Sequence, residues 1–173
     1  YFGALLHDLG KIGIPVEILE FPGKLCPQAM RVMRTHVELT EKILGQDVEE
    51  KIKRNDLRHH EKMEGSGYPE GISGKDLTMG ERIVAVADIV SALAGTRSYK
   101  DAFPKERILS IINKMKEDGL IDKDVVDKVT MDFDEIMEIT RNRCQPILDM
   151  YHRIQSEYLQ IEGYMAGNNQ AGI

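Results

Sequence analysis

The chain has 173 residues, of which 42% are hydrophobic, 30% are charged and 6% are aromatic. This length is typical of a single domain and is sufficient to bury a core. The net charge of −6 argues against a generic binder of polymeric nucleic acid or of an anionic membrane, because such proteins are usually basic. No apolar run approaches the roughly 20 residues that cross a bilayer. Only two Cys occur, so we expect a cytoplasmic protein without a signal peptide or membrane contact.

Helical signals dominate the first sixty residues. The spacing of apolar residues and the positions of Gly and Pro predict helices over 1–9, 16–20, 27–44 and 47–62. The last of these is very polar, and a bound metal is one reason for it to be ordered. The chain opens at Tyr1 inside an apolar run, which indicates a piece of a longer protein.

A long loop separates these helices from a second helical region. Residues 64–76 are rich in Gly, and a loop of this length favours a function. Thr78 and Glu81 have the spacing of a capping box, which predicts the start of a helix that runs to about residue 94. This helix is apolar almost all round, as central helices are. Further helices are expected from Pro104 and from Asp122.

The last helix is predicted over about 133–161, with apolar residues three and four positions apart. This spacing fits a coiled-coil seam, and thus a homodimer, as well as a helix that lies on its own domain. No strand pattern of useful length occurs, so the fold class is all-α. We divide the chain into a domain over 1–120, a helical extension of that domain over 121–166 and a disordered tail over 167–173.

The side chains with metal-binding chemistry gather in a few places. Imidazoles and carboxylates without a thiolate cluster suit Fe, Mn or Zn. A buried, unpaired Asp88 inside an apolar helix would be costly, so it needs a cation or several hydrogen bonds. Each residue has an ordinary structural explanation when taken singly, and the prediction depends on their joint occurrence. The candidate ligands are His7, Asp8, His36, His59, His60 and Asp88.

These residues stand in motifs that resemble a known family. His7-Asp8-Leu9-Gly10-Lys11 looks like the HD signature of the metal-dependent phosphohydrolases. His59-His60-Glu61, followed by Gly67-Tyr68-Pro69, resembles the second signature of the HD-GYP branch. Asp88 and the later Arg97-Ser98-Tyr99-Lys100 resemble its next blocks. The match covers about residues 1–115, and the order of the motifs makes it specific.

The resemblance implies a helical HD-domain bundle, here with a long C-terminal helix, that acts in bacterial signal transduction. Such domains hydrolyse cyclic di-GMP to pGpG and often on to GMP, and some prefer other cyclic dinucleotides. Their sites hold two or three divalent metal ions, most often iron or manganese. A sensory or receiver domain upstream is also what the family suggests.

Carried over to this chain, the family pattern assigns metal binding to the six candidate ligands, with Asp8 as a bridge between two ions. His7, Asp8 and Lys11 form the catalytic group, in which a metal-bridged hydroxide is the nucleophile. Glu61 is expected to orient an imidazole. Substrate binding is assigned to Lys11, Tyr68, Arg97 and Lys100.

Two alternatives remain open at this stage. The same site could hydrolyse another phosphate ester or another cyclic dinucleotide. The chain could also be a catalytically impaired module that binds a cyclic dinucleotide or a signalling partner. Ser91 favours the second alternative, because the family usually carries Asp there. The family also places a further metal-ligating His upstream of the HD pair, so we expect this piece alone to be impaired.

Overall fold

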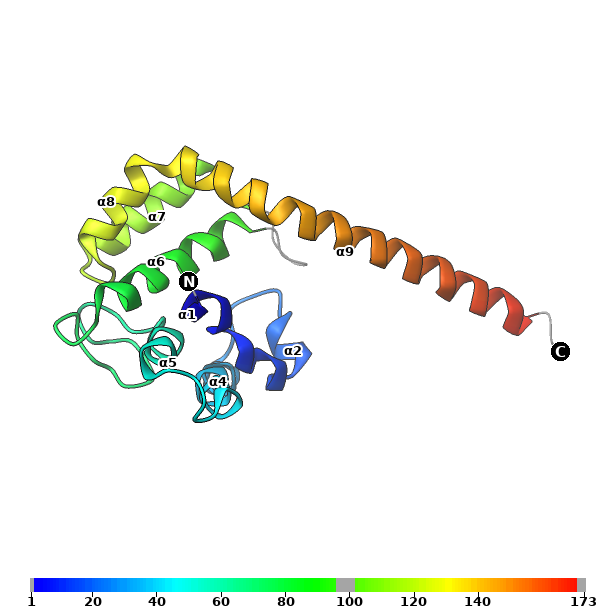
Figure 1. Cartoon of the computed structure of the whole chain (residues 1–173), viewed down its shortest axis with the longest axis horizontal. Coiled ribbons are helices and arrows are strands. Elements are labelled where there is room, and N and C mark those ends of the chain that lie inside the picture. The colour runs from blue at the N-terminus through cyan, green and yellow to red at the C-terminus, as the bar shows by residue number, and fades with distance from the viewer. Residues whose placement is uncertain (1, 96–101, 171–173) are drawn as a thin grey trace. The chain divides into compact units, whose positions relative to one another are not determined.

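The computed structural model describes residues 2–95 and 102–170, with side chains as far as residue 164 (Figure 1). Within these ranges every regular element is helical and no strand occurs, which confirms the all-α prediction. The elements are α1 (Phe2–Leu6), the 3-10 helix η1 (Leu9–Gly13), α2 (Val16–Leu19), α3 (Pro27–Arg34), α4 (His36–Leu44), α5 (Glu50–Leu57), α6 (Met79–Ala94), α7 (Lys105–Glu117), α8 (Lys123–Met131) and α9 (Phe133–Gln170).

The chain forms two compact units, Tyr1–Thr130 and Met131–Ile173. The first unit includes α8, and the domain boundary expected at residue 120 stays a prediction. Val126 of α8 is completely buried, and Asp122, just before α8, pairs with Arg82 of α6 at 3.1 Å. The Asp122 carboxylate also accepts hydrogen bonds from the backbone nitrogens of Asp124 and Val125, which confirms the predicted cap.

In the first unit, α6 contacts α1, α5 and α7. The capping box predicted at its start is present: Thr78 Oγ1 accepts from the nitrogen of Glu81, and the Glu81 carboxylate accepts from the nitrogen of Thr78. Its buried apolar residues are Ala85, Val86 and Val90. Ile83 is 48% exposed, so one face of this apolar helix is not covered.

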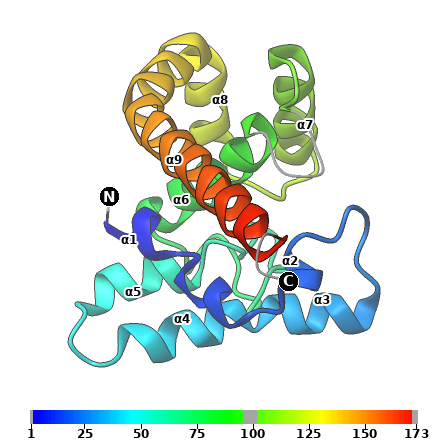
Figure 2. The same cartoon turned by 90° about the vertical axis from the view of Figure 1, so that its right-hand side faces the viewer.

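The helix expected over 27–44 is divided in two at Thr35. The Thr35 hydroxyl donates to the carbonyl oxygen of Val32 at 2.7 Å, a local bond that competes with regular helical bonding. Figure 2 shows that α3 and α4 nevertheless follow each other in nearly the same direction. The break makes His36 the first residue of α4, which also contacts η1 and α5.

The polar helix expected over 47–62 is shorter, because α5 ends at Leu57 with Arg58 as its C-cap. His59 and His60 therefore lie beyond the helix, and the angle of a regular helix does not govern their directions. The loop over 64–76 is present and includes a cis peptide bond between Tyr68 and Pro69.

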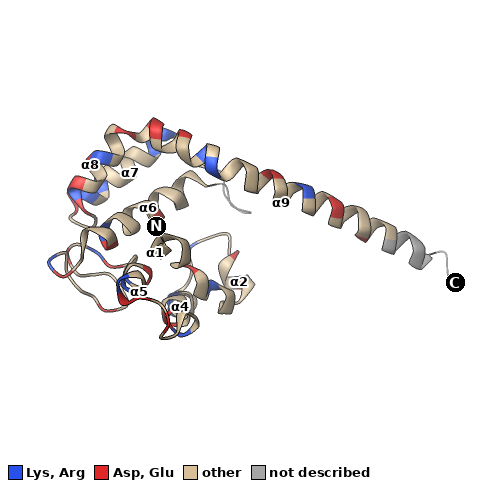
Figure 3. Ribbon diagram, viewed as in Figure 1, with Lys and Arg blue, Asp and Glu red and all other residues tan. Residues whose placement is uncertain are grey.

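The second unit consists mainly of α9, with Pro146 in its interior. Lys, Arg, Asp and Glu all occur along it (Figure 3). The helix continues to Gln170, whereas we expected a disordered tail from residue 167; residues 171–173 lie outside the described part. No helix among the described residues is both long enough and apolar enough to span a bilayer.

Candidate metal centre

Four segments that are distant in the sequence deliver the six candidate ligands. His7 and Asp8 lie in the turn between α1 and η1. His36 begins α4, and the pair His59-His60 follows α5. The sixth ligand is Asp88, at the centre of α6.

Short distances connect all six side chains into one cluster. The Nε2 atom of His7 lies 3.2 Å from Asp8 Oδ2 and 3.5 Å from Asp88 Oδ1. Nε2 of His36 is 3.6 Å from Asp8 Oδ1, which places Asp8 between two imidazoles. Ligand atoms lie within 4.8 Å of one another in two groups, which are His36, His59 and His60, and His7, His59 and Asp88.

The Nδ1 atom of three of these imidazoles is occupied by a backbone carbonyl three residues earlier. Each ring therefore keeps Nε2 for another partner, and its orientation is fixed, as is usual for metal-binding His. The pairs are His7 with Ala4 at 2.9 Å, His36 with Met33 at 2.7 Å and His59 with Asp56 at 2.5 Å.

Two carboxylates favour a positive charge at His7. The carboxylates of Asp8 and Asp88, which lie 3.2 and 3.5 Å from its Nε2 atom, raise the pKa of the His7 imidazole to about 10. Burial acts to raise the pKa of Asp8, but the neighbouring His7 imidazole and a hydrogen bond from Lys11 prevail and hold it well below its ordinary value. A divalent cation can replace the proton as the positive charge that these carboxylates hold.

The other imidazoles are kept neutral by burial. Burial lowers the pKa of His59 to about 4 and that of His60 to about 3, and it also lowers the pKa of His36. Neutral imidazole is the form that binds a metal ion.

Buried ligand atoms without hydrogen-bond partners are a second observation that fits a metal centre. Among the described residues, four buried ligand atoms have no hydrogen-bond partner: Asp8 Oδ1 and the Nε2 atoms of His7, His36 and His59. A buried polar atom without a partner costs about 1–3 kcal/mol, so four in one cluster need an explanation. Imidazole and carboxylate ligands suit first-row transition metals.

Gly10 allows the backbone around His7 to approach α4 closely. A Cβ atom at this position would overlap the carbonyl oxygen of His36 and the backbone nitrogen of Thr40. The nitrogen of Gly10 donates to the Thr40 hydroxyl at 2.8 Å. Gly10 therefore sets the distance between the HD pair and His36, a role that we did not predict.

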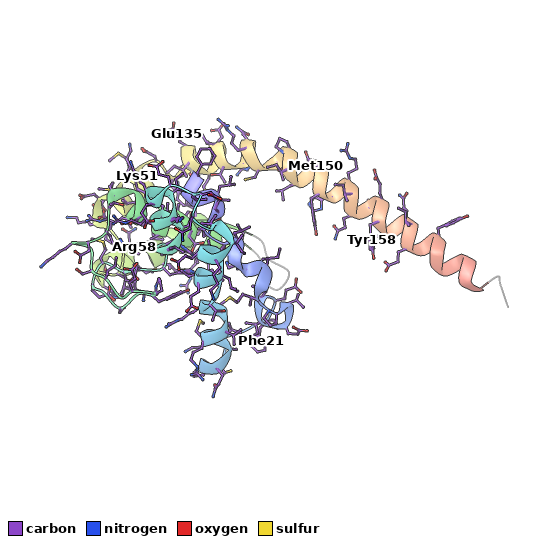
Figure 4. All side chains as sticks on the ribbon, turned by 60° about the horizontal axis from the view of Figure 1, so that its bottom comes forward. Phe21, Lys51, Arg58, Glu135, Met150 and Tyr158 are labelled. Atoms are coloured by element: carbon purple, nitrogen blue, oxygen red, sulfur yellow. The ribbon has the colours of Figure 1, made fainter. Side chains whose placement is uncertain are left out.

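Glu61 holds the loop rather than an imidazole, which differs from our expectation. Its Oε1 atom accepts from the backbone nitrogens of Glu70 at 2.7 Å and Gly71 at 3.0 Å. Arg58 supports the same loop, because its guanidinium binds both carboxylate oxygens of Glu70 and also pairs with Glu81. Arg58 is labelled in Figure 4.

Of the predicted substrate-binding residues, the structure describes Lys11 and Tyr68. The Tyr68 ring stacks on His60, with ring centroids 4.6 Å apart, and burial raises the pKa of its hydroxyl. Lys11 Nζ lies 2.5 Å from Asp8 Oδ2. Arg97 and Lys100 lie outside the described residues. Ser91 is exposed on α6, one turn after Asp88.

Sequence reasoning did not single out Arg34, which places its guanidinium carbon 4.6 Å from the centroid of the Tyr68 ring. The only signal available in the sequence was its position two residues before His36.

Comparison with known proteins identifies the family of the chain. Residues 1–125 match the family model of the HD domain. A 3'3'-cGAMP-specific phosphodiesterase 3 of Vibrio cholerae is 40% identical over 112 residues, which is 64% of this chain and 24% of that protein. The cyclic di-GMP phosphodiesterase response regulator RpfG of Xanthomonas campestris is 41% identical over 112 residues, covering 63% and 30% of the two chains.

A cyclic di-GMP phosphodiesterase of Thermotoga maritima is 38% identical over 117 residues, covering 66% of this chain and 32% of the relative. The chain thus spans about a quarter to a third of the length of these relatives. The motifs and the six clustered side chains all fall within residues 1–125, which match the HD domain family model. The chain belongs to the HD domain family and is of the HD-GYP type.

Proposed function

We propose that the chain hydrolyses the phosphodiester bonds of cyclic di-GMP in a metal-dependent reaction, to pGpG and onward to GMP. The observation that carries the proposal is the cluster of six imidazole and carboxylate side chains, in which four buried ligand atoms have no hydrogen-bond partner among the described residues. Relatives named as cyclic di-GMP and 3'3'-cGAMP phosphodiesterases support the substrate class.

The six clustered side chains would hold two or three divalent ions, iron or manganese, with Asp8 between two of them. Bound ions of this kind acidify water to give a nucleophile at neutral pH and neutralise charge on the phosphoryl oxygens. The carbonyls of Ala4, Met33 and Asp56 hold three imidazoles in the orientation that leaves Nε2 free.

Other side chains would act on the substrate directly. Lys11 pairs with Asp8 and would bring a compact positive charge to the scissile phosphate. Tyr68 lies against His60 and would form one side of the substrate site. We keep the assignment of Arg97 and Lys100 to phosphate binding as part of the proposal.

The test is turnover of cyclic di-GMP by the purified protein with Fe²⁺ or Mn²⁺ under anaerobic conditions, with products separated by chromatography. Asp8→Asn should abolish turnover, because it removes the charge that lies between two imidazoles. Asp47→Asn makes the same chemical change at an exposed position and should leave turnover intact. Retained turnover in Asp8→Asn would overturn the proposal.

Two of the alternatives stay testable in the same assay. A panel with 3'3'-cGAMP separates the substrates that the relatives' names suggest. Tight binding of cyclic dinucleotide without metal and without products would favour a binding module instead. The name of RpfG as a response regulator supports a further proposal, that this domain is the output of a longer signalling protein.

We also propose that α9 pairs with a second copy of the chain. Ile147, Tyr151, Ile154, Tyr158 and Ile161 are spaced three and four residues apart, and each is more than half exposed. Figure 4 shows the side chains of Met150 and Tyr158 projecting from the α9 ribbon. A repeat of this kind buries its apolar stripe in a coiled coil.

Light scattering tests the pairing. We expect twice the 19.6 kDa of one chain, and a shift to one chain in Ile154→Glu. Ser156→Glu adds the same charge at a polar position of α9 and should leave the dimer intact. A wild-type mass of one chain would refute the pairing.

A further inference from the structure

We infer that Arg34 binds the second phosphodiester of the cyclic dinucleotide, the one that is not being cleaved. Its guanidinium lies on the ring of Tyr68, which stacks on His60 of the metal cluster. The inference rests on the proposed function and assigns one more residue to the substrate site.

Ring contacts connect Arg34 to the metal cluster. The His36 and His60 ring centroids are 5.1 Å apart, those of His60 and Tyr68 are 4.6 Å apart, and the guanidinium carbon of Arg34 is 4.6 Å from the Tyr68 ring. Arg34 thus lies beyond the ligand side chains, at the edge of the site that Tyr68 forms.

The guanidinium of Arg34 is available for an anion. Arg54, Arg58 and Arg82 each pair with a carboxylate. Among the residues that the structure describes, no carboxylate pairs with Arg34. Arg34 is exposed, and its contact with the Tyr68 ring occupies no carboxylate, so its guanidinium retains N–H donors for an anion.

The substrate supplies the matching charge. A cyclic dinucleotide carries two phosphodiesters in one ring, and each has one negative charge. The six candidate ligands, once loaded with metal, would hold the phosphate that is cleaved. The second phosphate needs cations of its own, and Arg34 is one whose place beside Tyr68 the structure describes. The planar fork of a guanidinium matches two phosphate oxygens, which an ammonium group cannot do.

The experiment compares two substrates in the Mn²⁺-loaded protein. Cyclic di-GMP contains two phosphodiesters, whereas bis(p-nitrophenyl) phosphate contains only the one that is cleaved. For Arg34→Ala we expect KM for cyclic di-GMP to rise about 10- to 100-fold, the equivalent of one charge-assisted hydrogen-bonded contact. The loss of kcat/KM should be at least about fivefold larger for cyclic di-GMP than for the small diester.

Further variants separate binding from structure. Arg34→Lys keeps the charge but loses the planar fork, so its KM for cyclic di-GMP should lie between those of the wild type and Arg34→Ala. Arg107→Ala removes an exposed arginine from α7, which carries no candidate ligand, and should match the wild type. Tyr68→Leu removes the ring that positions Arg34, so Arg34→Ala should cost less in that background.

Three outcomes would overturn the inference. An unchanged KM for cyclic di-GMP in Arg34→Ala is the first. An equal loss on both substrates, which indicates a structural effect, is the second. If the variant weakens binding of cyclic di-GMP but not inhibition by cyclic di-AMP, Arg34 contacts the guanine base instead of a phosphate. A wild-type protein that hydrolyses only the small diester would refute the proposed substrate, and is distinct from all three.

Discussion

Replacing Asp56 by Asn should stabilise the protein, and the gain should increase as the pH rises. Asp56 lies on α5 and is completely buried. Neither of its carboxylate oxygens accepts a hydrogen bond from any described residue. Burial raises the pKa of this carboxyl to about 7, from an ordinary value of 3.8. The folded protein therefore keeps a proton here that the unfolded chain releases.

The sign follows from proton linkage. Between pH 3.8 and about 7 the folded state binds one proton more than the unfolded state, so the free energy of unfolding falls as the pH rises. A difference of about 3 pKa units corresponds to about 4 kcal/mol once the pH exceeds the folded pKa. Between about pH 5 and about pH 8 the loss is about 2.5 kcal/mol. Asn resembles the protonated carboxyl but cannot ionise, so the variant escapes this loss.

Urea denaturation of the metal-free protein at several pH values measures the effect. The advantage of Asp56→Asn over the wild type should grow by about 2.5 kcal/mol from about pH 5 to about pH 8. The backbone carbonyl that accepts from His59 is unchanged by the substitution. Asp47→Asn, on an exposed residue, should show no such trend. A constant difference, or a variant that loses stability with rising pH, would refute the assignment of a neutral, buried Asp56.

Three further predictions concern the site. Gly10→Ala should lower the free energy of unfolding, measured by urea denaturation, by about 3 kcal/mol or more, because the new Cβ overlaps the backbone of His36 and Thr40. Gly163→Ala, in open space on α9, should stay within about 1 kcal/mol of the wild type. Equal effects of the two substitutions would contradict the close approach of Gly10 to α4. Glu61→Gln weakens two charge-assisted bonds to the loop, so amide hydrogen exchange at Glu70 and Gly71 should accelerate about tenfold. The control variant Glu64→Gln should leave the exchange rates of these two amides unchanged. Removing divalent ions with a chelator should lower the melting temperature by several degrees, since an ion present at 100 times its Kd adds about 2.7 kcal/mol; an identical melting curve with and without Mn²⁺ would contradict the metal centre.

The elements with local signals were predictable. The capping box of Thr78 and Glu81 is a short-range pattern, and both reciprocal bonds are present. Asp122 likewise caps α8 through bonds to the next turn. Such features depend on residues within three or four positions, which a single sequence displays.

Features that depend on long-range packing were not predictable in the same way. After α5 ends at Leu57, Glu61 holds the following loop through bonds to Glu70 and Gly71, nine and ten positions along the chain. The role of Gly10 becomes visible only when η1 lies against α4. The six ligands themselves were identified from motifs, and the structure brings them together; their binding of metal remains a prediction.

The Glu61 contact has a thermodynamic consequence for signalling. His59, His60 and Glu61 are consecutive, so two candidate metal ligands and the anchor of the 64–76 loop share one stretch of backbone. If ion binding restricts this stretch, it also restricts the loop, and the coupling is reciprocal. Any partner that prefers the anchored loop must then raise the affinity for the ion by the same factor by which the ion raises the affinity for that partner. A protein that binds the 64–76 loop in its anchored form would thus control how much of the metal centre is occupied, without contacting any of the metal-binding side chains.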